Sequence, residues 1–440
     1  MLLMSPSTRR QLPAVIDPFR RVPIPRDVDP PVSRGPEVDP ESVGMTRQGV
    51  EDIWQHAMRL YRLRLHPALS LCVRREGHVV LNRTVGWSRG ISPRHPFGMA
   101  PDGPPVEATV DTPFCVFSSS KAITATVIHL LDERGIIRTT DRVAEYVPSF
   151  RVPGKQDVTI EHVLSHRAGL PFLPRGAVDI DKIDDRDHMI AAMAAATMMH
   201  RAGAKLAYHA VSGGFVLGEV VLQATGKDIR TVLAEEILTP LGFRWTNYGV
   251  SVGDLPAVGM AYPTGPMLLP PASLLIERAL GLPGDQVTAM SNDPRFLTGI
   301  VPAANVVTTA NELSRFMDLL RAGGTLDGVT VLNPRTIRSA VVERTYHQLD
   351  RTLGLPIRHG NGFMLGARTL SLYGPDTEEA FGHLGFTNVM AWADPRRELA
   401  VGLITSGKPF VTPHVAALWD VTRQIGLAAP KVADPVLFRP

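Results

Sequence analysis

A serine and a lysine three residues apart, in the run Ser118-Ser119-Ser120-Lys121, are the residues best suited to chemistry in this chain. A free serine hydroxyl is a weak nucleophile, and it becomes reactive when a neighbouring base takes its proton. At the start of a helix, residues i and i+3 share a face, so the Lys121 amine can reach the Ser118 hydroxyl. The same residues are also typical of a serine-rich helix N-cap followed by a solvated lysine.

Two further segments could complete such a site. Tyr208 directly precedes a predicted helix, and a phenol held near Lys121 could act as a general acid and base, although a tyrosine in this setting also suits packing. The segment Phe381-Gly382-His383-Leu384-Gly385-Phe386 precedes an apolar strand. Its glycines would let backbone N–H groups approach a substrate closely, and they are equally compatible with a strand-entry turn.

The elements that must position these residues follow from hydrophobic spacing. Residues 46–63 have helical periodicity, residues 68–73 and 79–84 form a predicted β-hairpin, and a helix is expected from residue 122 to Gly135. Residues 159–240 are predicted to be mainly helical, strands are expected at 362–366, 387–394 and 399–405, and a closing helix at 415–425. Strands at both ends of the chain predict an α+β fold.

The domain organisation that we expect follows from this order of elements. Nine of the first 40 residues are proline, which indicates an extended N-terminal arm over residues 1–45. Residues 46–110 and 300–430 are expected to form a discontinuous α/β domain. Residues 111–299 should form a mainly helical domain with a Gly/Pro-rich insertion at 251–299.

Composition excludes several classes of protein. The chain has 440 residues, 44 % of them hydrophobic, so a disordered chain is excluded. Its formal charge of +3 gives no sign of a nucleic-acid partner, and two cysteines exclude a disulfide-built scaffold. No apolar run is long enough to span a membrane. Arg9 and Arg10 follow the short apolar start, an order untypical of a signal peptide, so we expect a cytoplasmic protein.

Together, and in this order, the three motifs resemble those of the serine β-lactamase and penicillin-binding protein family, especially its class C-like members and the related family VIII carboxylesterases. The resemblance extends over roughly residues 46–425 and includes Asp111-Thr112-Pro113-Phe114 and Thr239-Pro240-Leu241-Gly242-Phe243. It implies an antiparallel sheet flanked by helices, with an inserted helical domain, and no cofactor or metal.

The resemblance also assigns roles to the site residues. It implies that Ser118 is the acylated nucleophile, Lys121 its base and Tyr208 the general acid and base. His383-Leu384-Gly385 takes the place of the family's Lys-Thr-Gly motif. The backbone N–H groups of Ser118 and Phe386 would then form the oxyanion hole.

Two departures from the family pattern bear on the substrate. The chain reads Tyr208-His209-Ala210 where the class C pattern is Tyr-x-Asn, so the amide that would bind a β-lactam side chain is absent. His383 replaces a lysine that would hold a substrate carboxylate. We therefore expect a serine hydrolase, a carboxylesterase or lipase, that cleaves neutral carboxylic esters as small-molecule substrates through an acyl-enzyme. A β-lactamase, a D-alanyl-D-alanine peptidase and a catalytically silent binding protein are the alternatives, and the oligomeric state stays open.

Three other features are weaker candidates for a functional role. Gly249-Val250-Ser251-Val252-Gly253 matches the Gly-x-Ser-x-Gly pattern of a nucleophile elbow, but Pro256 follows where that elbow needs a helix. His162 and His166 stand four residues apart, and without an evident third ligand we expect a structural role rather than a metal site. Residues 266–283 are rich in leucine, and we hypothesise that they cover an apolar acyl pocket.

Overall fold

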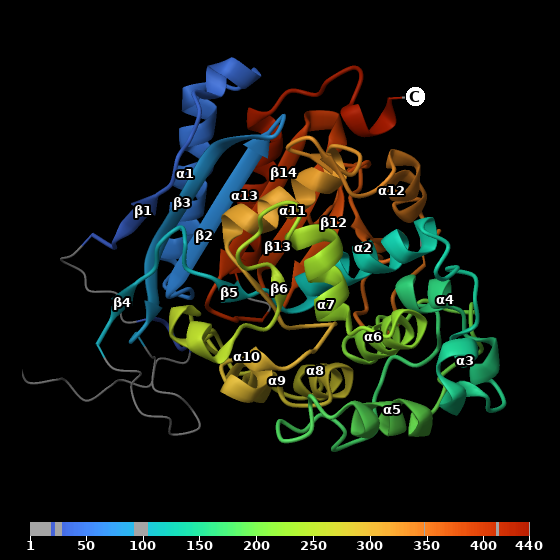
Figure 1. Ribbon diagram of the computed structural model, residues 1–440. Helices are drawn as coiled ribbons and strands as arrows, with labels where there is room; N and C mark the ends of the chain where they lie inside the picture. Colours follow the sequence, from blue (N-terminus) through green and yellow to red (C-terminus); the bar gives the residue numbers. More distant parts are fainter. Residues whose placement is uncertain (1–18, 23–28, 92–103, 347, 411–412, 440) are drawn as a thin grey trace, which may run out of the picture.

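The computed structural model describes residues 19–22, 29–91, 104–346, 348–410 and 413–439. Most of the proline-rich start of the chain lies outside these ranges. Within them, the chain folds as a central sheet with helices on both faces and a helical region beside one face (Figure 1). The predicted α+β fold, an antiparallel sheet flanked by helices, is confirmed.

The central sheet joins the two ends of the chain. Its hydrogen-bonded order is β1-β3-β2-β14-β13-β12-β11-β10, with β4 paired to β3, and its neighbouring strands are antiparallel. The join between the two ends is the pairing of β2 with β14, where Val73 lies opposite Val401. The strands of this sheet are β1 (Val32–Arg34), β2 (Ala68–Arg75), β3 (His78–Arg89), β4 (Val106–Glu107), β10 (Arg358–His359), β11 (Met364–Leu365), β12 (Phe381–Gly385), β13 (Val389–Asp394) and β14 (Leu399–Thr405).

Two short sheets accompany the central one. One is a three-stranded sheet with the order β5 (Phe114–Cys115), β7 (Val306–Thr308) and β6 (Asn247–Tyr248). The other is a hairpin of β8 (Thr325–Leu326) and β9 (Val329–Thr330). The strand that precedes Ser118 is β5, which pairs with β7 and not with the central sheet. This pairing sets the direction in which the chain enters the Ser118 turn.

The terminal helices α1 (Arg47–Arg62) and α13 (His414–Ala428) pack against each other on one face of the central sheet (Figure 1). Thr46 begins α1 as its N-cap, because its hydroxyl accepts the Gly49 N–H at 3.0 Å. The apolar side chains of α1, including Ile53 and Tyr61, are buried against strand residues. The α11 helix (Ala310–Arg321) contacts β14, β2 and β13.

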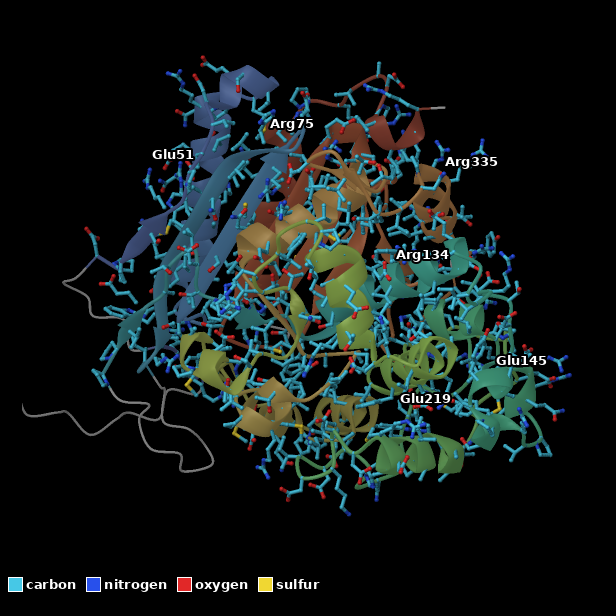
Figure 2. All side chains as sticks on the ribbon, in the orientation of Figure 1. Glu51, Arg75, Arg134, Glu145, Glu219 and Arg335 are labelled. Carbon is cyan, nitrogen blue, oxygen red and sulfur yellow. The ribbon has the colours of Figure 1, made fainter. Side chains whose placement is uncertain are left out.

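The remaining helices lie mainly in the region between β5 and β7. They are α2 (Ser120–Glu133), α3 (Val143–Tyr146), α4 (Ile160–Leu164), α5 (Arg186–Ala195), α6 (Ser212–Thr225), α7 (Ile229–Leu233), α8 (Ala272–Leu280), α9 (Gly284–Met290) and α10 (Pro294–Thr298), with α12 (Pro334–Ala340) later in the chain. Residues 251–299 thus contain three α-helices. Figure 2 shows charged side chains both on the helices that cover the central sheet, such as Glu51 on α1, and in the helical region, such as Glu219 on α6.

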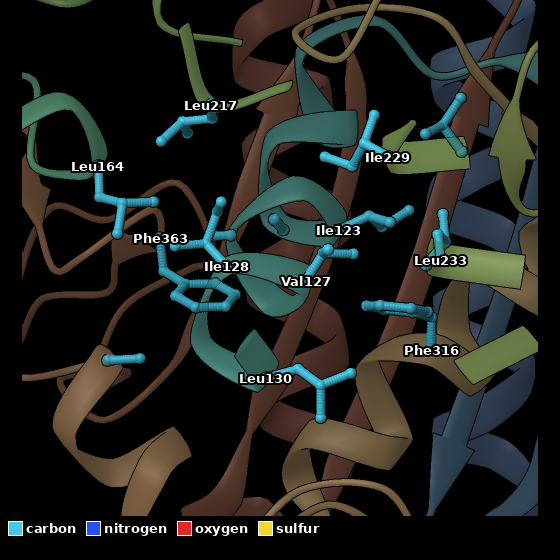
Figure 3. Packing of buried hydrophobic residues seen from close by; sticks show 14 of the residues in the cluster. Ile123, Val127, Ile128, Leu130, Leu164, Leu217, Ile229, Leu233, Phe316 and Phe363 are labelled. Carbon is cyan, nitrogen blue, oxygen red and sulfur yellow. The ribbon is translucent and has the colours of Figure 1, made fainter. Parts of the chain in front are cut away.

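The α2 helix is the buried centre of the molecule. Ile123, Val127 and Ile128 pack among apolar side chains of other elements, including Leu217 and Phe363 (Figure 3). Because its side chains from Ser120 to Leu131 are buried, α2 cannot shift without disturbing several neighbours. This packing gives the start of α2 a rigid position. Within the described residues, no helix has the length and apolar character needed to cross a membrane.

Candidate active site

Ser118 lies in a short 3-10 turn, Phe117–Ser119, that runs directly into α2. Phe117 has a φ of 48°, a left-handed conformation that is unusual for a non-glycine residue and that turns the chain sharply from β5 into the helix. The Ser118 side chain is half-buried, whereas Ser119 and Ser120 are buried. The turn therefore leaves Ser118 as the most accessible of the three serines.

Lys121 lies one helical turn after Ser118, and its Nζ is 3.0 Å from the Ser118 Oγ. The amine also donates to the carbonyl oxygens of Ala210, at 2.7 Å, and Ala303, at 3.0 Å. Burial lowers the pKa of Lys121 to about 7. A neutral amine has two N–H groups for the two carbonyls, and its lone pair is then directed at the Ser118 hydroxyl. The arrangement can accept the Ser118 proton.

Tyr208 lies against Lys121 from the segment before α6. The Lys121 Nζ is 5.2 Å from the centre of the Tyr208 ring. Burial raises the pKa of the Tyr208 phenol, and a hydrogen bond with Ser118 partly offsets that rise. The phenol therefore stays protonated at neutral pH and can donate a proton next to Ser118.

The β12 strand closes the other side of the Ser118 turn. Ser119 Oγ donates to the His383 carbonyl oxygen at 3.1 Å, which ties the strand to the turn. A Cβ on Gly385 would lie 2.3 Å from the Val116 carbonyl oxygen, so only glycine permits this approach. The half-buried Phe386 follows, with its ring 5.5 Å from that of Phe117. The site residues expected from the sequence, including His383, Gly385 and Phe386, thus come together around one turn.

Buried residues that we did not expect to be near the site surround Tyr208. Asp350 Oδ1 accepts the Tyr208 backbone N–H at 3.1 Å, and the His359 ring lies 6.4 Å from the Tyr208 ring. Neither residue belongs to a local motif, and both come from a part of the chain more than 140 residues after Tyr208. No local signal in a single sequence could have identified them.

The other candidate motifs lie apart from this arrangement. Ser251 is exposed, and its Oγ donates to Asp254 Oδ2 at 2.7 Å in a 3-10 segment, Val252–Ala257, rather than at the start of an α-helix. His162 Nδ1 accepts the Thr159 N–H at 3.2 Å at the start of α4, while His166 Nδ1 accepts the His209 N–H at 3.2 Å. In the part of the chain that the structure describes, no group of three or more His, Cys, Asp or Glu residues is arranged to hold a metal ion.

A cleft of about 660 Å³ lies near the insertion. Its lining includes the apolar residues Val178, Ile180, Leu282 and Met290 and the polar residues Asp179, Gln286, Asn292 and Asp293. Leu282 and Met290 pack on the same apolar cluster as Phe117 and Phe386. Leu274 and Leu275 of α8 are instead 59 % and 60 % exposed, so these two leucines point to solvent.

Comparison with known proteins identifies the family of the chain. The Beta-lactamase family model matches residues 59–423, and the chain belongs to this family. It is 31 % identical to the Esterase/beta-lactamase LipL of Mycobacterium tuberculosis over 309 residues, covering 67 % of this chain and 70 % of LipL. The protein is therefore of the β-lactamase and penicillin-binding-protein type of serine hydrolase.

Solved structures of this type superpose on most of the chain. A family VIII carboxylesterase matches with a TM-score of 0.73 and 26 % identity, covering 89 % of this chain and 99 % of the esterase. A penicillin-binding protein homologue from Caulobacter crescentus matches with a TM-score of 0.71 and 26 % identity, covering 90 % of this chain and 100 % of the homologue. The predicted family resemblance is confirmed.

Proposed function

We propose that the protein hydrolyses neutral carboxylic esters through an acyl-enzyme on Ser118. The observation that carries this proposal is the buried Lys121 amine, 3.0 Å from the Ser118 Oγ and held by the carbonyls of Ala210 and Ala303. An amine whose pKa is about 7 is neutral in half of the molecules at neutral pH, and it can then act as a base.

The reaction has two halves. Lys121 takes the hydroxyl proton as the Ser118 Oγ attacks the ester carbonyl, and the resulting oxyanion is held by the backbone N–H groups of Ser118 and Phe386. The C–O bond to the alcohol then breaks, and Tyr208 gives the leaving oxygen its proton while Lys121 returns a proton to the phenolate. Water, activated by the same groups, attacks the acyl carbonyl and releases the acid and Ser118.

The residues around the site favour an uncharged substrate. His383 stands where the family carries a lysine, and burial holds its pKa well below the usual value, so this position carries no fixed positive charge for a substrate carboxylate. Ala210 supplies a backbone carbonyl to Lys121 but no side-chain amide for a β-lactam. The names of LipL and of the family VIII carboxylesterase agree with ester cleavage.

We also infer that the acyl chain lies along the apolar side of this cleft, formed by Val178, Leu282 and Met290, because the apolar cluster that Leu282 and Met290 pack against includes Phe117, the neighbour of Ser118. This replaces the sequence-based hypothesis of a cover formed by residues 266–283 as a whole, since Leu274 and Leu275 are exposed.

Intact-mass measurement after exposure to a fluorophosphonate and to p-nitrophenyl esters tests the proposal. We expect one adduct on the wild type, none on Ser118→Ala, strongly slowed labelling on Lys121→Ala and unchanged labelling on Ser251→Ala. Nitrocefin turnover that exceeds ester turnover would instead identify a β-lactamase. A wild type that forms no adduct would identify a silent binding protein.

A further inference from the structure

Four histidines with almost no solvent exposure gather around the Tyr208 ring. The rings of His166, His359 and His383 have their centres 4.5, 6.4 and 6.0 Å from the centre of the Tyr208 ring. His209 follows Tyr208 in the chain, and its ring lies 5.7 Å from that of His166. The four come from the segment after α4, the segment before α6, β10 and β12. The reaction steps described above use none of their imidazoles.

Among them, His166 has the most contacts with the Tyr208 segment. Its backbone carbonyl accepts the Ala207 N–H at 3.0 Å, and its Nδ1 accepts the His209 N–H at 3.2 Å. His166 therefore binds the residues on both sides of Tyr208 while its ring packs on the phenol. Its φ of 59° is left-handed, a conformation that only a few residue types such as histidine and asparagine adopt readily.

This hydrogen bond defines which ring nitrogen of the neutral His166 carries the proton. Since Nδ1 accepts from a backbone N–H, the ring proton must be on Nε2, and a second proton on Nδ1 would face the His209 N–H donor directly. A void of about 20 Å³ borders Lys121, His166 and His209, which is room for one water molecule.

The surroundings of His166 disfavour its protonation. The titratable groups that face it are His209, His359, His383, Lys121 and the Tyr208 phenol, each neutral or cationic. Burial, followed by the electrostatic effect of His359, His209, His383 and Lys121, holds the pKa of His166 well below its usual value. The nearby carboxyl group is Asp350, whose Oδ2 is 3.9 Å from His359 Nε2 and whose Oδ1 is occupied by the backbone N–H groups of Tyr208, Thr352 and Leu353.

We propose that His166 is a positioning residue that holds the Tyr208 phenol against Ser118 and Lys121 only while its imidazole is neutral. At acidic pH, Tyr208 is then no longer held in the site. This inference rests on the proposed ester hydrolysis and adds to it. Protonation of His166 removes the acceptor of the His209 N–H and places a positive charge on the ring that packs on Tyr208. The 206–210 segment then loses one of its anchors.

Leaving-group dependence provides a readout that a purely structural role would not move. His166→Asn keeps a left-handed backbone and a side-chain oxygen near the His209 N–H, and it removes the ring. The leaving group is protonated in the acylation half of the reaction, which kcat/KM reports, whereas esters of the same acid share the later hydrolysis of the acyl-enzyme. Because general acid catalysis matters most for a poor leaving group and contributes about 10²–10⁴-fold, we expect kcat/KM for an ethyl ester to fall at least about 10-fold. For a p-nitrophenyl ester, whose leaving group needs no proton, the fall should stay under about 3-fold. His162→Asn, one turn earlier, is the matched control and should match the wild type.

The pH profile tests the same inference without depending on one variant. Below the pKa of Lys121, a single protonation gives log kcat/KM a slope of 1 against pH. In the wild type, protonation of His166 should steepen this slope toward 2 in acid, reversibly on return to pH 7, with the circular dichroism spectrum unchanged. In His166→Asn the slope should remain 1.

Three results would overturn the inference while leaving the proposed function intact: a wild-type slope of 1 throughout the acid range, an equal fall of both esters in His166→Asn, or His166→Asn kinetics equal to the wild type. If His166→Asn does not fold, His359→Asn, at the sheet edge, should show the same leaving-group pattern more weakly, and its absence would count against the inference. A wild type that no fluorophosphonate labels at Ser118 would instead refute the proposed function.

Discussion

Replacing Gly385 by alanine tests how closely β12 must approach the Ser118 turn. The new Cβ would lie 2.3 Å from the Val116 carbonyl oxygen, 3.0 Å from Val389 Cβ and 3.1 Å from Ser119 Oγ, whereas ordinary van der Waals contact begins at 3.4 Å. The nearest of these atoms belongs to the backbone, so the strand must move away from the turn by about 1 Å. Phe386, the next residue, moves with it.

The expected loss follows from that displacement. A misplacement of about 1 Å in an active site can cost about 10²-fold in rate, and overpacking of this kind costs about 1–3 kcal/mol of stability. We therefore expect Gly385→Ala to lower kcat/KM for a p-nitrophenyl ester by about 10²-fold while the protein still folds.

Steady-state ester hydrolysis and urea unfolding, measured on the same preparations, separate the two effects. Gly253→Ala is the matched control, because a Cβ there would meet only Ser251 Oγ, at 3.8 Å. It should keep both activity and stability. If Gly385→Ala retained kcat/KM within about 3-fold of the wild type, the argument that the position of Phe386 relative to Ser118 determines activity would be refuted.

Two further predictions concern the base and the acyl cleft. Because burial lowers the pKa of Lys121 to about 7, kcat/KM should rise with pH through a midpoint near 7 as the amine loses its proton, and a rate already on its plateau at pH 5 would contradict this role. Met290→Trp should fill part of the cleft and lower kcat/KM for p-nitrophenyl decanoate at least about 10-fold relative to the acetate, since two methylene groups left unburied cost about 1.6 kcal/mol. Leu275→Ala, on the exposed face of α8, is the control, and an unchanged chain-length preference in Met290→Trp would remove the cleft from the acyl site.

Local patterns were sufficient for several elements of the fold. Helical periodicity over residues 46–63 corresponds to α1, Arg47–Arg62, and the hairpin expected at 68–84 corresponds to β2 and β3. The strand expected at 362–366 is only the two-residue β11, Met364–Leu365, near the sheet edge. Edge strands have few partners, so an apolar segment there is weakly defined by its own sequence.

The insertion at 251–299 was harder to interpret from the sequence. The sequence showed it only as a Gly/Pro-rich insertion, and glycine and proline disfavour helices, yet it contains α8, α9 and α10. Short helices of this kind depend on contacts more than on propensity, as when Phe410 packs against Gly284 at the start of α9.

By itself, the sequence placed the Lys121 amine within reach of the Ser118 hydroxyl, because a spacing of three residues at the start of a helix brings both side chains to one face. The order of the three motifs along the chain indicated the β-lactamase and penicillin-binding protein family. Only the tertiary structure decided that Lys121 is buried between the carbonyls of Ala210 and Ala303, and that His166, His359 and Asp350 surround Tyr208. These contacts join segments far apart in the chain, and burial, which lowers the pKa of the amine, is a property of the folded whole and not of any one segment.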